Sequence, residues 1–486
     1  MVNNIKESPL YRIINPRSIA FFGASNRFSS MGTNQLNSLK SLGFEGSIYP
    51  IHPREKKVLD LVAYQRVQDL PEIPDLAVMV LPTEVVPQVM EECGQKGIRH
   101  AIVVSGGFKE VGGSGAELEK RLLAVADRYG IRFLGPNCLG VANPHHKFNM
   151  TFLPFEGQAG FIGLASQSGS LITQMFGYLR RFGLGFSAGI SVGNEARVDI
   201  VECMQYLAAC PHTRVIGLYV ETIRRGRAFI ETARAIVPHK PVVAFYAGGS
   251  EAGKRAGFSH TGALAGPDAL YDGVFRQSGV IRANSITELF DFCWALGACP
   301  RPGGKRIIVQ THSGGPGAAA ADACSRSGLE LPSILVPTRQ QLAPLVPHTG
   351  SVSNPVDLTF AKNPLDYFAA IPDILLGAEN ADGLLVYFLA PSQSIRRTMQ
   401  DMGVSDDQIP QLTEKLFTDQ SRALTDLIEK YQKPLIGFTF QDYNDLFVRT
   451  LLEHGIVMLP APQRAARAMA ALVRYQQLSE KIHSKQ

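Results

Sequence analysis

The stretches AGFIGLASQSGS (residues 159–170) and RIIVQTHSGGPG (residues 306–317) have the same form, and they decide the fold class. Each is an apolar run that ends in a Ser-Gly turn and leads into a helix-length segment. Such a unit points a helix N-terminus at the carboxyl edge of a parallel sheet, where open α/β folds bind ligands. The N–H groups and the dipole of that helix end favour an anion. The pair therefore predicts one or two phosphate sites, with ordinary helix capping by Ser and Gly as the alternative.

The same alternation of short apolar runs and amphipathic segments continues along most of the chain. It is the βαβ pattern, which indicates parallel sheets covered by helices on both faces. We expect three α/β domains, residues 1–144, 145–300 and 301–486, with PRPGGK (residues 300–305) as the best linker by composition. Predicted strands in the first block include SIAFFGAS, GSIYPIHP, DLAVMVLP, HAIVVSGGF and RFLGPNCLG; later ones include GFSAGISVGNEA, RVIGLYVE, KPVVAFYAGG, ADGLLVYFLA, KPLIGFTF and GIVMLPAP.

Composition excludes several classes of protein. The 486 residues are 45% hydrophobic and 19% charged, with a net charge of +5, and they contain no Lys/Arg run that could follow a nucleic-acid backbone. No apolar run approaches the ~20 residues that span a bilayer, and the N-terminus lacks the apolar core of a signal peptide. The seven cysteines are scattered without CxxC spacing, which indicates reduced thiols and disfavours zinc. We therefore expect a cytoplasmic protein that binds neither nucleic acid nor membrane and holds no metal.

The first strand-to-helix turn, FFGASNRFSSMG (residues 21–32), resembles a nucleotide-binding turn but lacks GxGxxG. A dinucleotide site also needs an acidic residue at the end of the second strand, where this chain has Ile51, His52 and Pro53. NAD is therefore disfavoured. A nucleotide with a 3′-phosphorylated ribose does not need that acid. The alternative is a glycine required only for a tight turn.

His260 stands in AGKRAGFSHTGALAG (residues 252–266), a segment too rich in small residues for a core helix. A long Gly/Ala/Ser loop in a compact domain is typically functional, and an imidazole can accept and return a phosphoryl group near neutral pH. Glu221 ends the predicted strand RVIGLYVE. A carboxylate there can orient an imidazole and hold its ring proton, and a solvated edge glutamate is the alternative.

These segments carry a resemblance to a known family. SIAFFGAS, AVMVLP, VVSGGFKE, LGPNCLG, SQSGS, SVGNEA, LYVE, SHTGALAG, SGGPG and SVSNPVDLT occur in the family's order over nearly the whole chain. In them the chain resembles the α subunit of the NDP-forming (ADP-forming) acyl-CoA synthetases, an acetyl-CoA synthetase group in the succinyl-CoA synthetase superfamily. SHTGALAG together with GPNCLG is the most specific match. The resemblance implies an N-terminal Rossmann-like CoA-binding domain and two flavodoxin-like, parallel-sheet ligase domains, the first with the phosphohistidine loop.

The resemblance also implies roles for individual residues. His260 matches the histidine that is phosphorylated, and Glu221 matches the acid that steadies it. The implied CoA site comprises Gly23, Ala24, Ser25, Leu81, Pro82, Ser105 and Gly106, with Asn137 close by. The implied phosphate-binding positions are Ser166, Gln167, Ser168 and Gly169 and, in the third block, Ser313, Gly314 and Gly315.

The implied activity is that of an acid–thiol ligase, which interconverts acyl-CoA, phosphate and ADP with a carboxylic acid, CoA and ATP through acyl phosphate and phosphohistidine. The three blocks leave no room for an ATP-grasp module, and no Walker A motif occurs. The resemblance therefore implies a hetero-oligomer with an ATP-grasp β subunit that holds Mg²⁺ with ADP or ATP. A CoA- or acyl-CoA-binding regulatory protein with decayed phosphotransfer is the alternative, and an NAD-type oxidoreductase is the weakest hypothesis.

Some positions depart from the family pattern. His52 and His312 each replace a usual asparagine, and Tyr246, Gly248 and Gly249 stand where the family has Lys and then Gly-Arg. Tyr246 and Gly249 remove two cations near the histidine loop, which bears on the strength of the phosphate site. These changes indicate a divergent branch, in which acyl specificity does not carry over from acetate.

Overall fold

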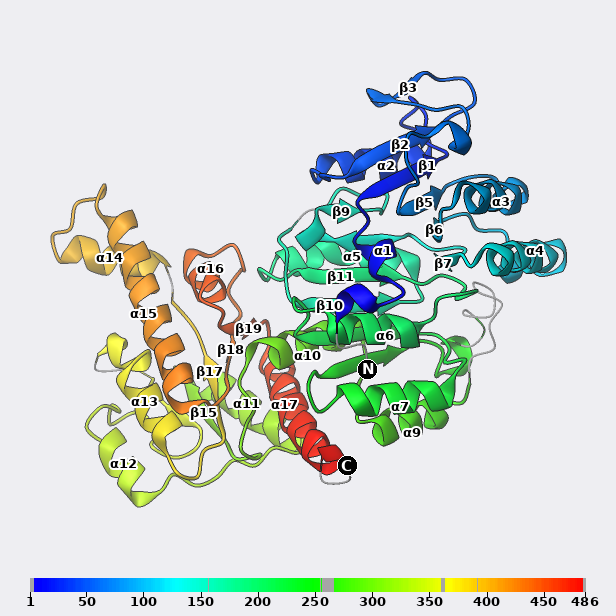
Figure 1. Cartoon of the computed structure of the whole chain (residues 1–486). Coiled ribbons are helices and arrows are strands. Elements are labelled where there is room, and N and C mark those ends of the chain that lie inside the picture. Colours follow the sequence, from blue (N-terminus) through cyan, green and yellow to red (C-terminus); the bar gives the residue numbers. More distant parts are fainter. Residues whose placement is uncertain are drawn as a thin grey trace. The chain divides into compact units, whose positions relative to one another are not determined.

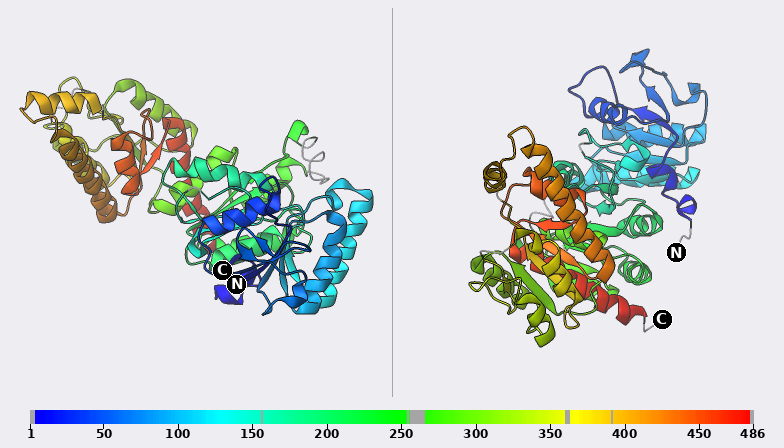
Figure 2. Two further views of the ribbon diagram at one scale, coloured as in Figure 1. Left: turned by 90° about the horizontal axis from the view of Figure 1, so that it is seen from above. Right: turned by 90° about the vertical axis from the view of Figure 1, so that its left-hand side faces the viewer.

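The structure is a computed structural model that describes residues 4–155, 157–253, 255, 266–359, 363–390 and 392–483. It divides into two compact units (Figure 1 and Figure 2). The first unit comprises Met1–Arg180 and Leu184–Ser285, and the second comprises Arg181–Gly183 and Ile286–Gln486. No helix in the described residues is both long and apolar enough to cross a bilayer.

The first sheet of the first unit is entirely parallel, with the strand order β2-β1-β5-β6-β7. Its central strands are buried along their whole length, which is why they are continuous apolar runs in the sequence. Helices α3 and α4 pack together beside it. The bounds are β1 (Ser18–Phe22), β2 (Ser47–Ile51), β5 (Leu76–Met79), β6 (His100–Val103), β7 (Arg132–Leu134), α1 (Tyr11–Ile14), α2 (Met31–Ser41), α3 (Val86–Lys96) and α4 (Gly113–Tyr129), with a small hairpin of β3 (Lys57–Val58) and β4 (Leu61–Val62).

The second sheet has the order β14-β13-β12-β10-β11-β8-β9. The strands from β14 to β11 are parallel, but β8 pairs antiparallel with β11, and β9 pairs antiparallel with β8. The bounds are β8 (Val141–Asn143), β9 (Phe148–Asn149), β10 (Ile162–Ser166), β11 (Phe186–Ser191), β12 (Val215–Val220), β13 (Val242–Tyr246), β14 (Ile281–Ala283), α5 (Gly169–Arg180), α6 (Ile200–Ala209), α7 (Gly226–Ile236) and α9 (Asp268–Ser278).

The antiparallel hairpin at the edge of this sheet differs from the expected all-parallel arrangement. Its two strands have only three and two residues, too few for a periodic pattern to register in the sequence. The hairpin lies on both sides of residue 144, where the first domain was expected to end. The division into three domains stays a prediction, because the first two sheets lie in one compact unit.

The second unit contains a third parallel sheet, with the order β16-β15-β17-β18-β19. Helices α10 and α17 pack together there through two ion pairs, Arg464 with Asp291 at 2.6 Å and Arg467 with Glu288 at 2.8 Å. The bounds are β15 (Ile307–Thr311), β16 (Val356–Asp357), β17 (Gly383–Tyr387), β18 (Leu435–Phe438), β19 (Val457–Leu459), α10 (Ile286–Ala298), α11 (Gly314–Arg326), α12 (Val336–Leu342), α13 (Ala370–Gly377), α14 (Ser392–Asp401), α15 (Ile409–Tyr431), α16 (Leu446–Glu453) and α17 (Pro462–His483).

Candidate functional site

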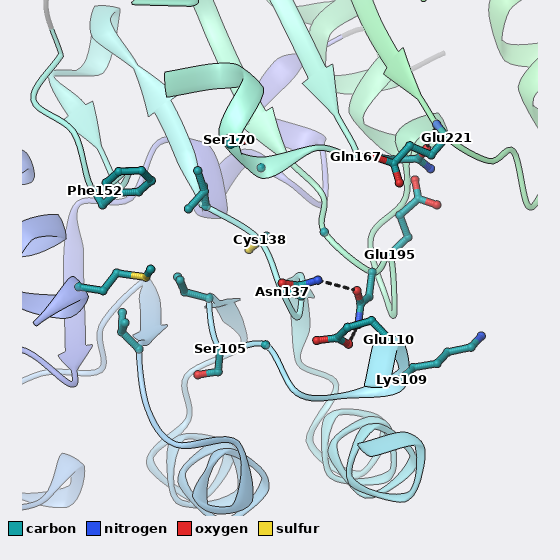
Figure 3. Close-up of a pocket in the computed structure, with 18 of the residues that line it drawn as sticks. Ser105, Lys109, Glu110, Asn137, Cys138, Phe152, Gln167, Ser170, Glu195 and Glu221 are labelled. Atoms are coloured by element: carbon teal, nitrogen blue, oxygen red, sulfur yellow. Dashed lines mark hydrogen bonds between the residues drawn. The ribbon is translucent and has the colours of Figure 1, made fainter. Parts of the chain in front are cut away.

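A cavity of about 740 Å³ lies in the first unit, among loops that follow strands of its two larger sheets (Figure 3). Most lining residues come from the segments after β5, β6 and β7 of the first sheet and after β10, β11 and β12 of the second, and Met31 of α2 and Phe152 after β9 also line the cavity. The carboxyl ends of parallel strands are the usual ligand-binding edge of an α/β sheet. The cavity brings together these residues that the sequence predicted: Leu81, Ser105, Gly106, Asn137, Gln167, Gly169 and Glu221.

On the side of the first sheet, hydrogen bonds from Ser105 hold the loops in place. Its hydroxyl accepts from the Leu81 N–H at 3.1 Å and donates to the Leu81 carbonyl at 2.6 Å, and its carbonyl accepts from the Asn137 N–H at 2.9 Å. Gly106 is close to Asn137, because a Cβ atom at Gly106 would lie 3.1 Å from Asn137 Oδ1. The Ser105 hydroxyl is thus committed to the fold, and a ligand here would meet mainly backbone and the Asn137 amide.

The predicted CoA-binding turn after β1, which contains Gly23, is fixed by close backbone packing. Gly23 has φ +95°, and a Cβ atom there would lie 1.9 Å from the Val80 carbonyl oxygen, so only glycine fits. The Ser25 N–H donates to Thr33 Oγ1 at 3.0 Å, which closes the turn onto α2. The glycine requirement therefore follows from packing against the segment after β5, whatever binds nearby. Among the residues that the structure describes, Gly23, Ala24, Ser25 and Pro82 do not line the cavity.

On the side of the second sheet, Gln167 organises the site. Its Oε1 accepts from the N–H groups of Glu221 at 2.5 Å and Thr222 at 2.9 Å, and its Nε2 donates to the Thr222 carbonyl at 2.8 Å. Gln167 thereby fixes the backbone that presents Glu221 at the cavity. The Ser166 hydroxyl donates to the Ser168 carbonyl at 2.6 Å, which folds the turn just before α5 begins.

The N-terminus of α5 reaches the cavity through Gly169 and Ser170. This helix end is the predicted anion site, because its first N–H groups have no partners within the helix. Ser166 and Ser168 precede this helix in the chain and are not among the described residues that line the cavity. Their contribution is to the shape of the turn.

Glu195 is a cavity residue that the sequence reasoning did not single out. Its side chain is only 2% exposed, its Oε1 accepts from the Ile200 N–H at 2.9 Å, and burial raises its pKa to about 7. The Arg224 guanidinium donates to the carbonyls of Glu195 at 2.8 Å and of Asn194 at 2.7 Å. The segment SVGNEA ends a predicted strand and carries part of the resemblance, but an acidic residue in such a segment gives no sign of burial from sequence alone.

Asn194 connects the two sides of the cavity. Its Nδ2 donates to Glu110 Oε2 at 2.5 Å, and its Oδ1 accepts from Asn137 Nδ2 at 3.3 Å, as the dashed lines in Figure 3 show. Arg224 and Lys109 are the cationic residues among the described lining. The cavity therefore combines backbone donors, amides, two cations and three carboxyl groups, a set suited to a polar, anionic ligand whose protonation changes.

His260 lies outside the described residues, so its role stays a prediction. At the end of β13, the buried Tyr246 ring stacks on Tyr271 with centroids 3.6 Å apart, and the Tyr246 hydroxyl donates to the Gly266 carbonyl at 2.9 Å. A Cβ atom at Gly249 would lie 2.1 Å from Asp268 Oδ1. Neither position supplies the cation expected from the family pattern, and Tyr246 is instead part of the packing against α9.

The third predicted phosphate position belongs to the second unit. Ser313 is the N-cap residue of α11, which begins at Gly314, and Gly315 follows within it. The Thr311 hydroxyl donates to the Ser313 carbonyl at 2.7 Å. His312 stacks on Tyr367 with centroids 3.4 Å apart, and burial lowers its pKa to about 4.

His52 is a further position that departs from the family pattern. His52 Nδ1 accepts from the N–H groups of Arg54 at 3.2 Å and Glu55 at 2.9 Å, so the histidine caps a turn after β2. Over the described ranges, no group of three or more His, Cys, Asp or Glu residues is arranged to hold a metal ion.

Comparison with protein families gives two matches. Residues 17–144 match the CoA binding domain, and residues 159–296 match the succinyl-CoA ligase like flavodoxin domain. The first range contains the whole first sheet, and the second contains the strands β10 to β14 with the loops that line the far side of the cavity.

Similar proteins include several ADP-forming acid–CoA ligases. The α subunit of ADP-forming acetate–CoA ligase I from Pyrococcus furiosus is 34% identical, with 98% of this chain and 100% of that protein covered. ADP-forming acetate–CoA ligase I from Archaeoglobus fulgidus is 36% identical over 98% of this chain, which spans 65% of that longer protein. This chain spans about half of other relatives, such as the 4-hydroxybutyrate–CoA ligase of Nitrosopumilus maritimus, at 50%.

A solved structure agrees with these relatives. The dinucleotide-forming acetyl-coenzyme A synthetase 1 of Candidatus Korarchaeum cryptofilum, in complex with phosphate and ADP, superposes with a TM-score of 0.86 at 32% identity, and 98% of each chain is covered. The predicted family and the α/β fold class are thus confirmed. The chain belongs to the family of ADP-forming acetate–CoA ligases and corresponds to their α subunit.

Proposed function

We propose that this chain binds an acyl-CoA and phosphate in the cavity, forms an acyl phosphate there, and passes the phosphoryl group to His260. The observation that carries this proposal is the cavity itself, since it joins loops of the CoA-binding segment to the N-terminus of α5 and to Glu221. The reaction needs a thioester, a phosphate and a proton-holding acid within reach of one another.

The proposed chemistry has two steps. Phosphate, held by the N–H groups of Gly169 and Ser170, attacks the thioester carbon, so a C–O bond forms and the C–S bond to CoA breaks. His260 then attacks phosphorus through one ring nitrogen and releases the carboxylate. Glu221, fixed by Gln167, accepts a hydrogen bond from the other ring nitrogen and stabilises the phosphorylated imidazole.

The nucleotide step is assigned to a partner. Relatives named as α subunits imply a second subunit, and we propose that it is an ATP-grasp β subunit that holds Mg²⁺ with ADP or ATP. The acid is a small or aromatic carboxylic acid, since relatives are named for acetate, 4-hydroxybutyrate and trans-ferulate.

The test is labelling with radioactive inorganic phosphate in the presence of a panel of acyl-CoA thioesters. The full chain is expected to gain acid-labile, base-stable phosphate, and His260→Ala is expected to reduce labelling by at least about 10⁴-fold, because the nucleophile is removed. His348→Ala, which alters an exposed histidine of the second unit, is the matched control. Undiminished labelling of His260→Ala would contradict the assignment.

A second experiment distinguishes a ligase from a regulatory protein that binds CoA or acyl-CoA. With Mg–ADP added, the purified chain is expected to form ATP only when the β subunit is supplied. CoA binding without labelling by any thioester, even with the β subunit present, would favour the alternative of a regulatory protein whose phosphotransfer has decayed.

A further inference from the structure

The loop that carries Glu195 is held in an unusual backbone conformation at the edge of the cavity. Gly193 has φ +57° and Glu195 has φ +51°, a left-handed conformation that non-glycine residues seldom adopt. A Cβ atom at Gly193 would lie 2.2 Å from the Pro136 carbonyl, and the N–H groups of Asn194 and Ala196 donate to Pro136 and Gly135. The loop is therefore fastened to the segment before Asn137, and this fixes Glu195 between the two sides of the cavity.

The carboxyl group of Glu195 is buried, and its hydrogen bonds offset that burial only in part. Oε1 accepts from the Ile200 N–H, and the Gln167 side chain also bonds the carboxyl group. Oε2 lies 3.9 Å from Arg224 Nε, whose other nitrogens are bonded to backbone carbonyls. Figure 3 shows this carboxyl group directed toward Gln167 and Glu221. A group placed in this way can exchange a proton with a ligand without being exposed to bulk water.

Charged and titratable groups face Glu195 from each neighbouring element. Arg224 and Arg225 come from the segment after β12, and Asp199 and Cys203 come from the start of α6. Burial is the largest influence on the pKa of Glu195 and raises it. The hydrogen bonds from the Gln167 side chain and the Ile200 N–H lower this pKa, and the smaller effects of charge are that Arg224 lowers it and Asp199 raises it. The Arg225 guanidinium is bound to Asp199 at 2.5 Å, so these two charges largely offset each other. The effect of burial on the pKa therefore prevails.

The acyl-transfer step requires such a group. When hydrogen phosphate attacks the thioester, its proton must leave as the C–O bond forms, and the CoA thiolate must gain a proton as the C–S bond breaks. We infer that Glu195 carries this proton: its carboxylate takes the proton from phosphate and returns it to the CoA sulfur, and it ends the step unchanged. The inference rests on the proposed function and adds a second acidic residue to it, distinct from Glu221, which serves His260.

The reverse half-reaction gives the sharpest test. Acetyl phosphate, or the acyl phosphate of the acid selected by the thioester panel, is mixed with CoA and the full chain, and thioester formation is followed. The CoA thiol must then lose its proton to Glu195 before attack. The value of kcat/KM is expected to rise with pH through about 7 and to become flat at higher pH. A thiol has a pKa of about 8.5, so titration of the CoA thiol itself would place the rise in rate at a higher pH.

Glu195→Gln is expected to slow thioester formation by about 100-fold or more and to abolish the pH limb. The amide can still accept from the Ile200 N–H, so the loop is retained. Phosphorylation of His260 by the same acyl phosphate, which needs no such proton transfer, is expected to change by less than about threefold, and this readout also confirms folding. Glu288→Gln is the control, since Glu288 is also buried but lies in the second unit, where it pairs with Arg467.

The outcomes distinguish the two proposals. If the wild-type chain neither forms thioester nor becomes phosphorylated, the proposed function fails and the role of Glu195 fails with it. If the wild-type chain is active but its rate is flat between about pH 5.5 and 8, or if Glu195→Gln keeps both rate and limb, the function stands and the role of Glu195 is overturned. Equal loss in both half-reactions would show a structural role only.

Discussion

The turn between β10 and α5 and the turn between β15 and α11 have nearly the same local construction. In the first, the Ser166 hydroxyl donates to the carbonyl two residues on at 2.6 Å; in the second, the Thr311 hydroxyl does the same at 2.7 Å. Both strands are buried along their length, and both helices begin with glycine. The two turns therefore present helix N-termini by the same device, and their difference lies in the residue between.

That residue is Gln167 in the first turn and His312 in the second. Gln167 makes three hydrogen bonds to the segment after the neighbouring strand and thereby positions Glu221. His312 stacks on Tyr367, and its Nε2 has no hydrogen-bond partner in the part of the chain that the structure describes. One side chain serves the organisation of a site and the other serves packing, although the sequence patterns around them are alike.

The largest expected difference is in the pH dependence of stability, where Glu195, which is bonded by Gln167 of the first turn, is compared with His312 of the second turn. The pKa of Glu195 is raised from 4.5 to about 7 in the folded state, so between these pH values the folded state holds a proton that the unfolded state has released. This bound proton stabilises the folded state at low pH, and the stabilisation is lost as the pH rises through about 7. The pKa of His312 is lowered to about 4, so the unfolded state binds the proton below about 6.5, and stability falls as pH falls from there. Each effect is about 3 kcal/mol.

The check is urea unfolding of the wild-type chain, Glu195→Gln and His312→Phe at several pH values. Glu195→Gln is expected to remove the loss of stability between about pH 5 and 7, and His312→Phe, which keeps the stack on Tyr367, is expected to remove the loss below about pH 6.5. Relative to the wild-type chain, the two variants are expected to change the slope of unfolding free energy against pH in opposite directions. Changes in the same direction would contradict the comparison.

Much of this comparison was accessible from the sequence. Apolar runs that end in Ser-Gly predicted both strand–turn–helix units, and Glu221 was expected at a strand end, where it lies directly after β12. Periodicity and turn composition are local properties, so they predict local structure well. The ligase family followed from the order of the segments and is confirmed by the relatives.

The parts that sequence reasoning missed depend on contacts between distant residues. The burial of Glu195 is set by a loop that packs on residues 135–137, and the bonds of Gln167 reach residues 221 and 222. The conformation of Gly23 is likewise required by packing on Val80, as the alternative of a tight-turn glycine allowed, and its role in CoA binding stays a prediction. Along the chain, the division between the two compact units falls between residues 285 and 286, ahead of the glycine-rich linker, because α10 packs against α17 within the second unit; the three-domain division stays a prediction.

A smaller effect is expected from exchanging the middle residues of the turns for apolar side chains. Gln167→Met leaves the Glu221 and Thr222 N–H groups without their acceptor, so Glu221 loses its fixed position. Phosphohistidine formation is expected to slow by about 30-fold, or about 2 kcal/mol. His312→Phe is expected to leave this rate within about twofold. Single-turnover labelling measures both, and a slower His312→Phe would show that the second turn also serves this step.

The smallest expected effect comes from the hydroxyl groups that the two turns share. Ser166→Ala removes one hydrogen bond to a carbonyl two residues on, and it is expected to cost about 1 kcal/mol of stability. Thr311→Val removes the equivalent bond and also the bond that Thr311 Oγ1 accepts from the Ser313 N–H at 3.1 Å, so its loss of stability is expected to be at least as large. The functional effects should differ, because only the first turn leads into the cavity, which Gly169 lines. A loosened first turn no longer holds the first N–H groups of α5 against the phosphate. Ser166→Ala is therefore expected to raise the KM for phosphate about fivefold in acyl-CoA phosphorolysis, a change of about 1 kcal/mol. Thr311→Val is expected to leave that KM unchanged. A raised KM in both variants would mean that the α11 turn also takes part in binding phosphate, and the comparison would then describe two sites of one kind.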